Sequence, residues 1–129
     1  MSALPHLPIA DVCIVGAGIS GLAARRQLRR RGLTTVVLEK SRGAGGRAAT
    51  RRSAEHVADL GAQFTSRESP AWSKFLEEAK SDLLPVQVAG LEHPRFVHRR
   101  GMSSLARLLL ADSAENVYFG QRVTKIQDR

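Results

Sequence analysis

The residues with the clearest chemical potential are three glycines at GxGxxG spacing, Gly16, Gly18 and Gly21. The apolar run 11–15 (DVCIV) precedes them and a helical pattern follows, which is the context of a dinucleotide-binding turn. Gly16 permits the sharp turn, Gly18 lets a pyrophosphate approach the backbone, and Gly21 lets the helix pack closely on the strand. The amides and the dipole at the start of that helix favour a bound phosphate.

A single carboxylate, Glu39, closes the second apolar run, 34–38 (TTVVL), and stands 18 residues after Gly21. A carboxylate at this offset accepts hydrogen bonds from an adenosine ribose and disfavours a ribose 2′-phosphate. The complete context argues against a glycine-rich turn without a ligand. NAD and FAD share the ADP half, so this unit alone does not separate them.

A glycine-rich basic loop follows the acid, in the segment 39–52 (EKSRGAGGRAATRR). A simple NAD dehydrogenase usually leads from its second strand into another helix. A loop of this kind can instead wrap an extended cofactor and set arginine guanidinium groups near its phosphates. The alternative is an exposed basic loop without a ligand. The candidate binding residues of the loop are Lys40, Arg42, Gly45, Gly46 and Arg47.

These motifs resemble a known group of flavoproteins. The pattern VGAGISGL…EKSRGAGGRAATRR is similar to the N-terminal FAD-binding segment of the monoamine oxidase and phytoene desaturase superfamily. The segments 58–64 (ADLGAQF) and 99–126 (RRGMSSLARLLLADSAENVYFGQRVTKI) narrow the resemblance to the renalase-like family, and it covers residues 11–127. The resemblance implies FAD, hydride transfer to the flavin from a small-molecule substrate, and reoxidation by O2. The implied substrate is an isomeric dihydronicotinamide dinucleotide, or an amine as in the wider superfamily.

The resemblance also implies which residues touch FAD. It places the Gly61–Gln63 segment near the flavin ring and the backbone of Val123 beside the adenine. The candidate cofactor-binding set is Gly16, Ala17, Gly18, Ser20, Gly21, Glu39, Lys40, Arg42, Gly45, Gly46, Arg47, Gly61, Ala62, Gln63 and Val123. Nothing in the sequence resembles a protein nucleophile or an acid–base pair, so no catalytic residue is assigned. That pattern is typical of flavin enzymes, in which the protein mainly binds and orients.

The predicted fold class is α/β, a Rossmann-like FAD-binding βαβ unit with the beginning of a mixed α+β substrate domain. Residues 1–9 are predicted as an N-terminal extension and 10–66 as the segment that binds the ADP half of FAD. Residues 67–129 are predicted as the start of the substrate domain, with a strand that returns to the FAD domain. Since renalase-like proteins are much longer, we expect an incomplete fold that is inactive by itself and able to pair with a C-terminal portion.

Hydrophobic periodicity predicts the individual elements. Strands are expected at 11–15, 34–38, 48–52, 56–58, 84–89, 95–98 and in two runs around Gly120 within 117–126. Helices are expected at 20–31, 69–80 and 101–116, with arginines on the outer face of the first. Ser69 is a plausible cap of the second helix and Ser103 or Ser104 of the third. Cys13 is expected to be buried in the first strand, and Trp72 is expected in the core.

Composition limits the other function classes. The net charge of +8, with 16 Arg and 4 Lys, raises the hypothesis of a nucleic-acid-binding module, but aromatic residues make up only 5% of the chain. A platform for stacking bases is therefore missing, and no nucleic-acid partner is expected. No apolar run approaches the ~20 residues of a membrane span, the start lacks a secretory pattern, and the histidines lack metal-ligand spacing. We expect a cytoplasmic protein without a metal. An NAD-binding dehydrogenase domain is the main alternative.

Overall fold

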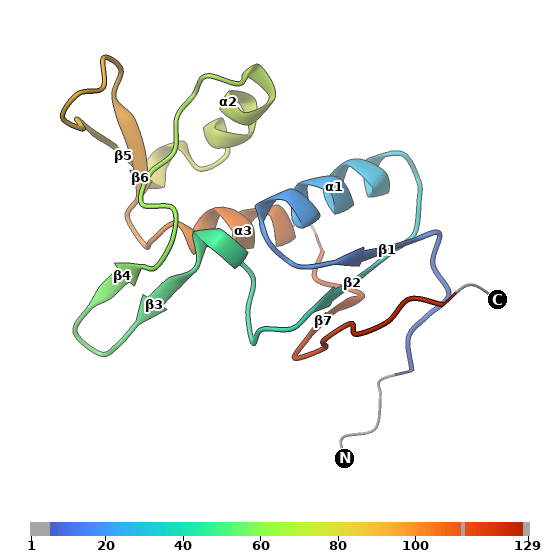
Figure 1. Ribbon diagram of the computed structural model, residues 1–129. Coiled ribbons are helices and arrows are strands. Elements are labelled where there is room, and N and C mark those ends of the chain that lie inside the picture. The colour runs from blue at the N-terminus through green and yellow to red at the C-terminus, as the bar shows by residue number, and fades with distance from the viewer. Residues whose placement is uncertain (1–5, 112, 128–129) are drawn as a thin grey trace.

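The computed structural model describes residues 6–111 and 113–127, which form three small sheets and three α-helices (Figure 1). The elements are β1 (Val12–Val15), α1 (Ile19–Arg30), β2 (Thr35–Glu39), β3 (Thr50–Arg52), β4 (Val57–Asp59), α2 (Pro70–Glu77), β5 (Leu83–Val86), β6 (Arg95–His98), α3 (Ser103–Leu110) and β7 (Val117–Phe119). Short 3₁₀ turns lie at Gly46–Ala48 and Lys80–Asp82. No helix within these ranges is long and apolar enough to cross a membrane.

The first sheet is parallel and has the order β1-β2-β7. Val12 pairs with Thr35, and Val37 pairs with Val117, so the chain returns to this sheet after a long excursion. Parallel strands joined by a crossover helix define the βαβ unit. The predicted α/β class with a Rossmann-like unit is therefore confirmed.

Helix α1 buries one face against the sheet and against α3. Leu22 is fully buried in the main core cluster, while Ile19 and Ala23 pack at its margin. Gly32 has φ +82°, a left-handed conformation that glycine tolerates at the end of a helix. The arginine-rich outer face predicted for this helix does not include Arg25, which is 2% exposed and donates a hydrogen bond to the Glu115 carbonyl at 2.9 Å.

The opposite face of this sheet is partly open, which corrects the expectation of a fully buried first strand. Burial alternates along β1, and Cys13 and Val15 are exposed, Val15 by 58%. Ile14 faces the other way and packs against the core cluster. Helices α1 and α3 lie on one side of the sheet (Figure 1), and β1 is an edge strand, so Cys13 is not a core residue.

Two antiparallel hairpins fill the excursion, at the positions where the sequence predicted short strands. Strands β3 and β4 pair around the turn at 53–56, and β5 pairs with β6. Thr65 forms a bridge to Phe96 of β6, with backbone hydrogen bonds of 2.8 and 2.9 Å. This bridge crosses the predicted domain boundary near residue 66, which stays a prediction.

The later elements are shorter than predicted. Helix α2 ends at Glu77 rather than near 80, because the chain continues as a 3₁₀ turn, although Ser69 does cap it by accepting from the Trp72 N–H. Helix α3 ends at Leu110. The second strand run predicted after Gly120 is absent from the described residues 121–127.

The capping prediction for α3 is wrong, because Met102 is the N-cap and no serine side chain caps the helix. Residues of the first hairpin do so instead. Asp59 Oδ1 accepts from the Met102 N–H at 2.9 Å and from the Thr50 hydroxyl at 2.6 Å, and Thr50 Oγ1 accepts from the Ser103 N–H at 2.9 Å. The start of α3 is therefore satisfied from 43 residues away.

We expect Asp59→Ala to destabilise the chain by about 1–3 kcal/mol, since it leaves the Met102 N–H without its acceptor. The measurement is urea unfolding followed by far-ultraviolet circular dichroism. Glu55→Ala, an exposed change in the same hairpin, is the matched control and should be neutral. Equal midpoints for the two variants would show that this cap contributes nothing.

Candidate functional site

The glycine turn between β1 and α1 is built by close backbone contacts. Gly16 has φ +106° and donates its N–H to the Leu38 carbonyl at 2.8 Å. A Cβ on Gly21 would lie 2.2 Å from the Gly16 carbonyl oxygen, so only glycine fits there. At Gly18 a Cβ would meet nothing closer than 3.9 Å. The requirement for glycine at Gly21 is therefore internal packing, whereas at Gly18 the fold alone imposes none.

Glu39, at the end of β2, ties this turn to the loop that follows. It is 6% exposed; its Oε2 accepts from the Ala17 N–H and its Oε1 from the Ser41 N–H, both at 2.7 Å. Burial raises the pKa of the Glu39 carboxyl, but these backbone hydrogen bonds and nearby Lys40 outweigh it, so the pKa lies below its ordinary value. A carboxylate has about four acceptor positions, so an ionised Glu39 can still accept from a ligand.

The lowered pKa predicts how stability depends on pH. A group whose pKa is depressed by folding stabilises the folded chain above its ordinary pKa of 4.5, and this contribution is lost as the pH falls through the lower folded value. We therefore expect acidification below pH 4.5 to destabilise wild type more steeply than Glu39→Gln. Urea unfolding across this range measures the two slopes. Parallel slopes would contradict the prediction.

The basic loop lies directly on the glycine turn. Gly45 donates its N–H to the Ala17 carbonyl at 3.0 Å and forms a bridge with Gly18. Gly45 and Gly46 have φ of +139° and +55°, which the change of direction requires. Arg47 follows as an exposed residue, so its guanidinium is available to an anion.

The segment 61–63 approaches the same region through Arg47. The Arg47 carbonyl accepts from the Ala62 N–H at 2.8 Å. A Cβ on Gly61 would lie 1.9 Å from that carbonyl oxygen. Gly61 thus allows the close approach, and Ala62 is brought to the glycine turn.

These segments enclose a cleft of about 650 Å³. Of the predicted residues, those that line it are Gly16, Gly18, Ser20, Gly21, Glu39, Lys40, Gly45, Gly46, Arg47 and Ala62. Val123 lines an adjoining cavity of about 290 Å³, to which Gly16, Glu39 and Lys40 also contribute. Neither cavity is lined by the other predicted residues, Ala17, Arg42, Gly61 and Gln63. Ala17 donates its N–H to Glu39, and Gly61 packs closely on Arg47, so these two support residues that do line the cleft.

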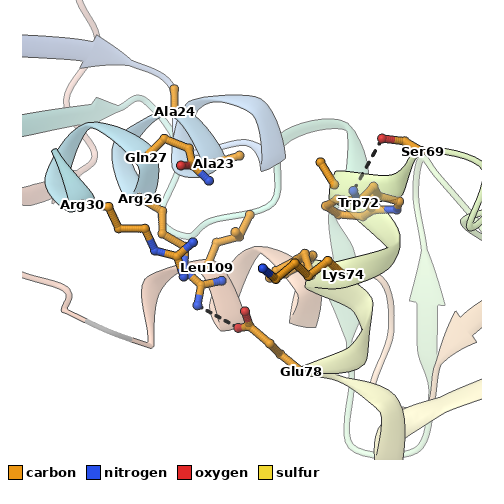
Figure 2. Close-up of a pocket in the computed structure, with 12 residues that line it drawn as sticks. Ala23, Ala24, Arg26, Gln27, Arg30, Ser69, Trp72, Lys74, Glu78 and Leu109 are labelled. Carbon is orange, nitrogen blue, oxygen red and sulfur yellow. Dashed lines mark hydrogen bonds and ion pairs between the residues drawn. The ribbon is translucent and has the colours of Figure 1, made fainter.

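The lining also contains residues that were not predicted to bind the cofactor, among them Ser41 and Gln121. Ser41 supplies a backbone N–H to Glu39, and Gln121 donates its N–H to the Glu39 carbonyl at 2.8 Å. Both interactions use main-chain N–H groups, which every residue except proline has. The residue types at these positions therefore could not predict them. A larger cavity of about 890 Å³ lies between α1 and α2 (Figure 2) and contains no predicted cofactor-binding residue.

Comparison with known proteins agrees with the Rossmann-like unit described above. Residues 14–79 match the family described as NAD(P)-binding Rossmann-like domain. A Drosophila melanogaster protein named "Possible lysine-specific histone demethylase 1" is 35% identical over 85 residues, which is 65% of this chain and 10% of that protein. Flavin-containing amine oxidase B of Homo sapiens is 41% identical over 71 residues, 54% of this chain and 13% of the enzyme.

Solved structures of putrescine oxidase are also similar. The wild-type enzyme bound to putrescine has a TM-score of 0.51 and 39% identity over 60% of this chain and 17% of that one. The chain thus spans between a tenth and a fifth of the length of these relatives.

Proposed function

This chain belongs to the NAD(P)-binding Rossmann-like domain family, and from that premise we propose that it is the FAD-binding N-terminal part of a monoamine oxidase-type flavin oxidoreductase. The observation that carries the proposal is the cleft that joins the glycine turn, Glu39, the basic loop and Ala62. Flavin-containing relatives among the amine oxidases support FAD as the cofactor.

The residues of the cleft fit the ADP half of FAD. The open space at Gly18, where a Cβ would find nothing within 3.9 Å, suits a pyrophosphate at the start of α1. Glu39 is ionised and retains acceptor positions for ribose hydroxyls. The exposed guanidinium of Arg47 can pair with a phosphate. Val123, in the adjoining cavity that Glu39 also lines, suits the adenine side.

When bound, FAD would supply the hydride acceptor. The residues of this chain would bind and orient it: Glu39 would hold the ribose, and the Gly45–Arg47 loop would neutralise and hold the phosphates. Ala62, carried by its hydrogen bond to Arg47, would define the direction in which the flavin end leaves the cleft.

The finer proposal concerns the substrate of the whole protein. The sequence resemblance to renalase-like enzymes supports a dihydronicotinamide dinucleotide, whereas the names of the relatives support an amine. We propose oxidation of one of these classes with O2 as the acceptor, in the cytoplasm. When purified protein that carries this chain is mixed with the correct class of substrate in the absence of air, its flavin colour should bleach. When air is admitted, the colour should return and hydrogen peroxide should be released.

A titration of one purified sample with FAD and with NAD tests the cofactor. We expect FAD to bind, with quenching of its fluorescence, and NAD to give a weak response or none. A strong response to NAD would instead favour the NAD-binding dehydrogenase alternative. Glu39→Ala should weaken FAD binding, because each charge-assisted hydrogen bond lost contributes about 1.5–3 kcal/mol. Protein that is colourless after incubation with excess FAD and removal of the free cofactor would remove the proposal.

A further inference from the structure

The groove of about 890 Å³ between α1 and α2 is separate from the cofactor cleft, since the two share no lining residue. Arg26 joins the two helices at this groove: its Nη2 donates to Glu78 Oε2 at 2.8 Å, and its guanidinium lies 5.8 Å from the centre of the Phe75 ring. We propose that this groove is a docking surface for an acidic, amphipathic segment of a partner protein.

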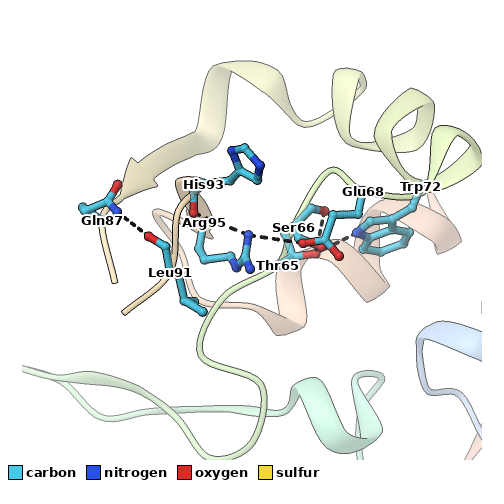
Figure 3. A network of polar contacts seen from close by, with 8 residues as sticks. All are labelled: Thr65, Ser66, Glu68, Trp72, Gln87, Leu91, His93 and Arg95. Atoms are coloured by element: carbon cyan, nitrogen blue, oxygen red, sulfur yellow. Dashed lines mark hydrogen bonds and ion pairs between the residues drawn. The ribbon is translucent and has the colours of Figure 1, made fainter. Parts of the chain in front are cut away.

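The floor of the groove is apolar. Phe75 and Leu109 are buried core residues, and the Trp72 ring lies 4.9 Å from the Phe75 ring. The Trp72 indole N–H donates to Thr65 Oγ1 at 2.7 Å (Figure 3), which fixes the orientation of this half-buried ring. Ala71 adds a small apolar side chain at the start of α2. Such a floor suits aliphatic or aromatic side chains of a docked segment.

The rim of the groove is cationic. Arg30 of α1 and Lys74 of α2 are exposed and extend from facing helices into the gap (Figure 2). Within residues 6–111 and 113–127, neither forms an ion pair with an acidic side chain, whereas Glu78 is paired with Arg26. Carboxylates on the docked segment would therefore meet two cations, and charge complementarity selects an acidic partner.

Other occupants fit less well. A second copy of this chain would bring its own net charge of +8, which opposes self-association. A nucleic-acid strand would find only one aromatic ring in the lining that is not buried, Trp72, and so no platform on which to stack successive bases. An acidic polypeptide with one apolar face matches both the floor and the rim.

Trp72 is the only tryptophan in the chain, so its fluorescence reports occupancy of the groove directly. The probe is a synthetic amphipathic helix of about 14 residues, about 21 Å long, with Leu on one face and Glu on the other. We expect a saturable shift in Trp72 emission. The same peptide with Gln in place of Glu should bind at least about tenfold more weakly, and added salt should weaken the Glu peptide.

A pair of matched double variants completes the test. Arg30→Glu with Lys74→Glu should weaken the Glu peptide at least about tenfold, whereas Arg31→Glu with Arg51→Glu makes the same charge change outside the groove and should bind nearly as wild type. FAD titration should be unchanged in both, which separates this proposal from the cofactor site. Equal binding of the Gln peptide, equal loss in the two variants, or no shift in emission would overturn it. So would a shift produced instead by an oligonucleotide or by raising the concentration of the chain alone.

Discussion

Gly61→Ala is expected to destabilise the chain by about 3 kcal/mol, the upper range for forcing a methyl group into a packed contact. The new Cβ would stand 1.9 Å from the Arg47 carbonyl oxygen and 2.9 Å from its carbon, both backbone atoms that cannot rotate aside. The two segments must separate, which also breaks the hydrogen bond from the Ala62 N–H to Arg47. Urea unfolding gives the loss of free energy.

Gly43→Ala is the matched control for this change. No heavy atom lies within 4 Å of a Cβ built at Gly43, and its φ lies outside the left-handed region. The substitution should therefore leave stability unchanged within about 0.5 kcal/mol. If both variants unfold at the same urea concentration, the close packing of residues 61 and 47 is not a stabilising feature of the fold.

Local patterns predicted the parts of the structure that local physics determines. The GxGxxG turn, α1 and Glu39 follow from glycine spacing and from periodicity over about 30 residues, and the structure places them as expected. Short strands were also predicted at the positions of both hairpins, but the pairing of β5 with β6 was not. The family match to residues 14–79 covers the glycine turn, α1, Glu39 and the first hairpin, but not the second hairpin.

The misses share a different cause, which is dependence on distant segments. Cys13 lies in an apolar run, but its burial depends on whether anything covers that face of the sheet. Arg25 is buried because the segment before β7 returns over α1 and offers the Glu115 carbonyl. The cap of α3 comes from Asp59 and Thr50 rather than from the nearby serines. None of these contacts has a signature in the adjacent sequence.

The candidate site also has a part that the sequence could predict and a part that it could not. Side-chain positions such as Glu39 and Arg47 could be read from residue type, but the main-chain donors at Ser41 and Gln121 could not, since any residue supplies them. Ala62 reaches the cleft only because Gly61 lacks a side chain against Arg47. The family resemblance places residues 61–63 near the flavin ring, which stays a prediction; the structure shows Ala62 lining the cleft beside the glycine turn.

Gly18→Ala should separate the glycine that the ligand requires from the glycine that the fold requires. Gly18 has φ −78° and ψ 175°, which alanine adopts freely, and its Cβ would meet no atom within 3.9 Å. As the N-cap of α1 it tolerates alanine at a cost of about 1 kcal/mol or less. The methyl group would, however, stand in the cleft where a pyrophosphate must approach the backbone. We expect near-normal unfolding and FAD binding weakened at least about tenfold, or 1.4 kcal/mol.

Gly21→Ala provides the contrast, because its Cβ would lie 2.2 Å from the Gly16 carbonyl oxygen and 3.3 Å from the Ile14 side chain. This variant should lose stability first, by about 1–3 kcal/mol, and FAD binding only as a consequence. Urea unfolding and FAD titration of both variants give two stabilities and two FAD affinities, and the proposal predicts the direction of change in each. Normal FAD affinity in Gly18→Ala would place the pyrophosphate away from the start of α1. Strong destabilisation in Gly18→Ala would instead mean that Gly18 serves the fold, and its link to a ligand would then have no support.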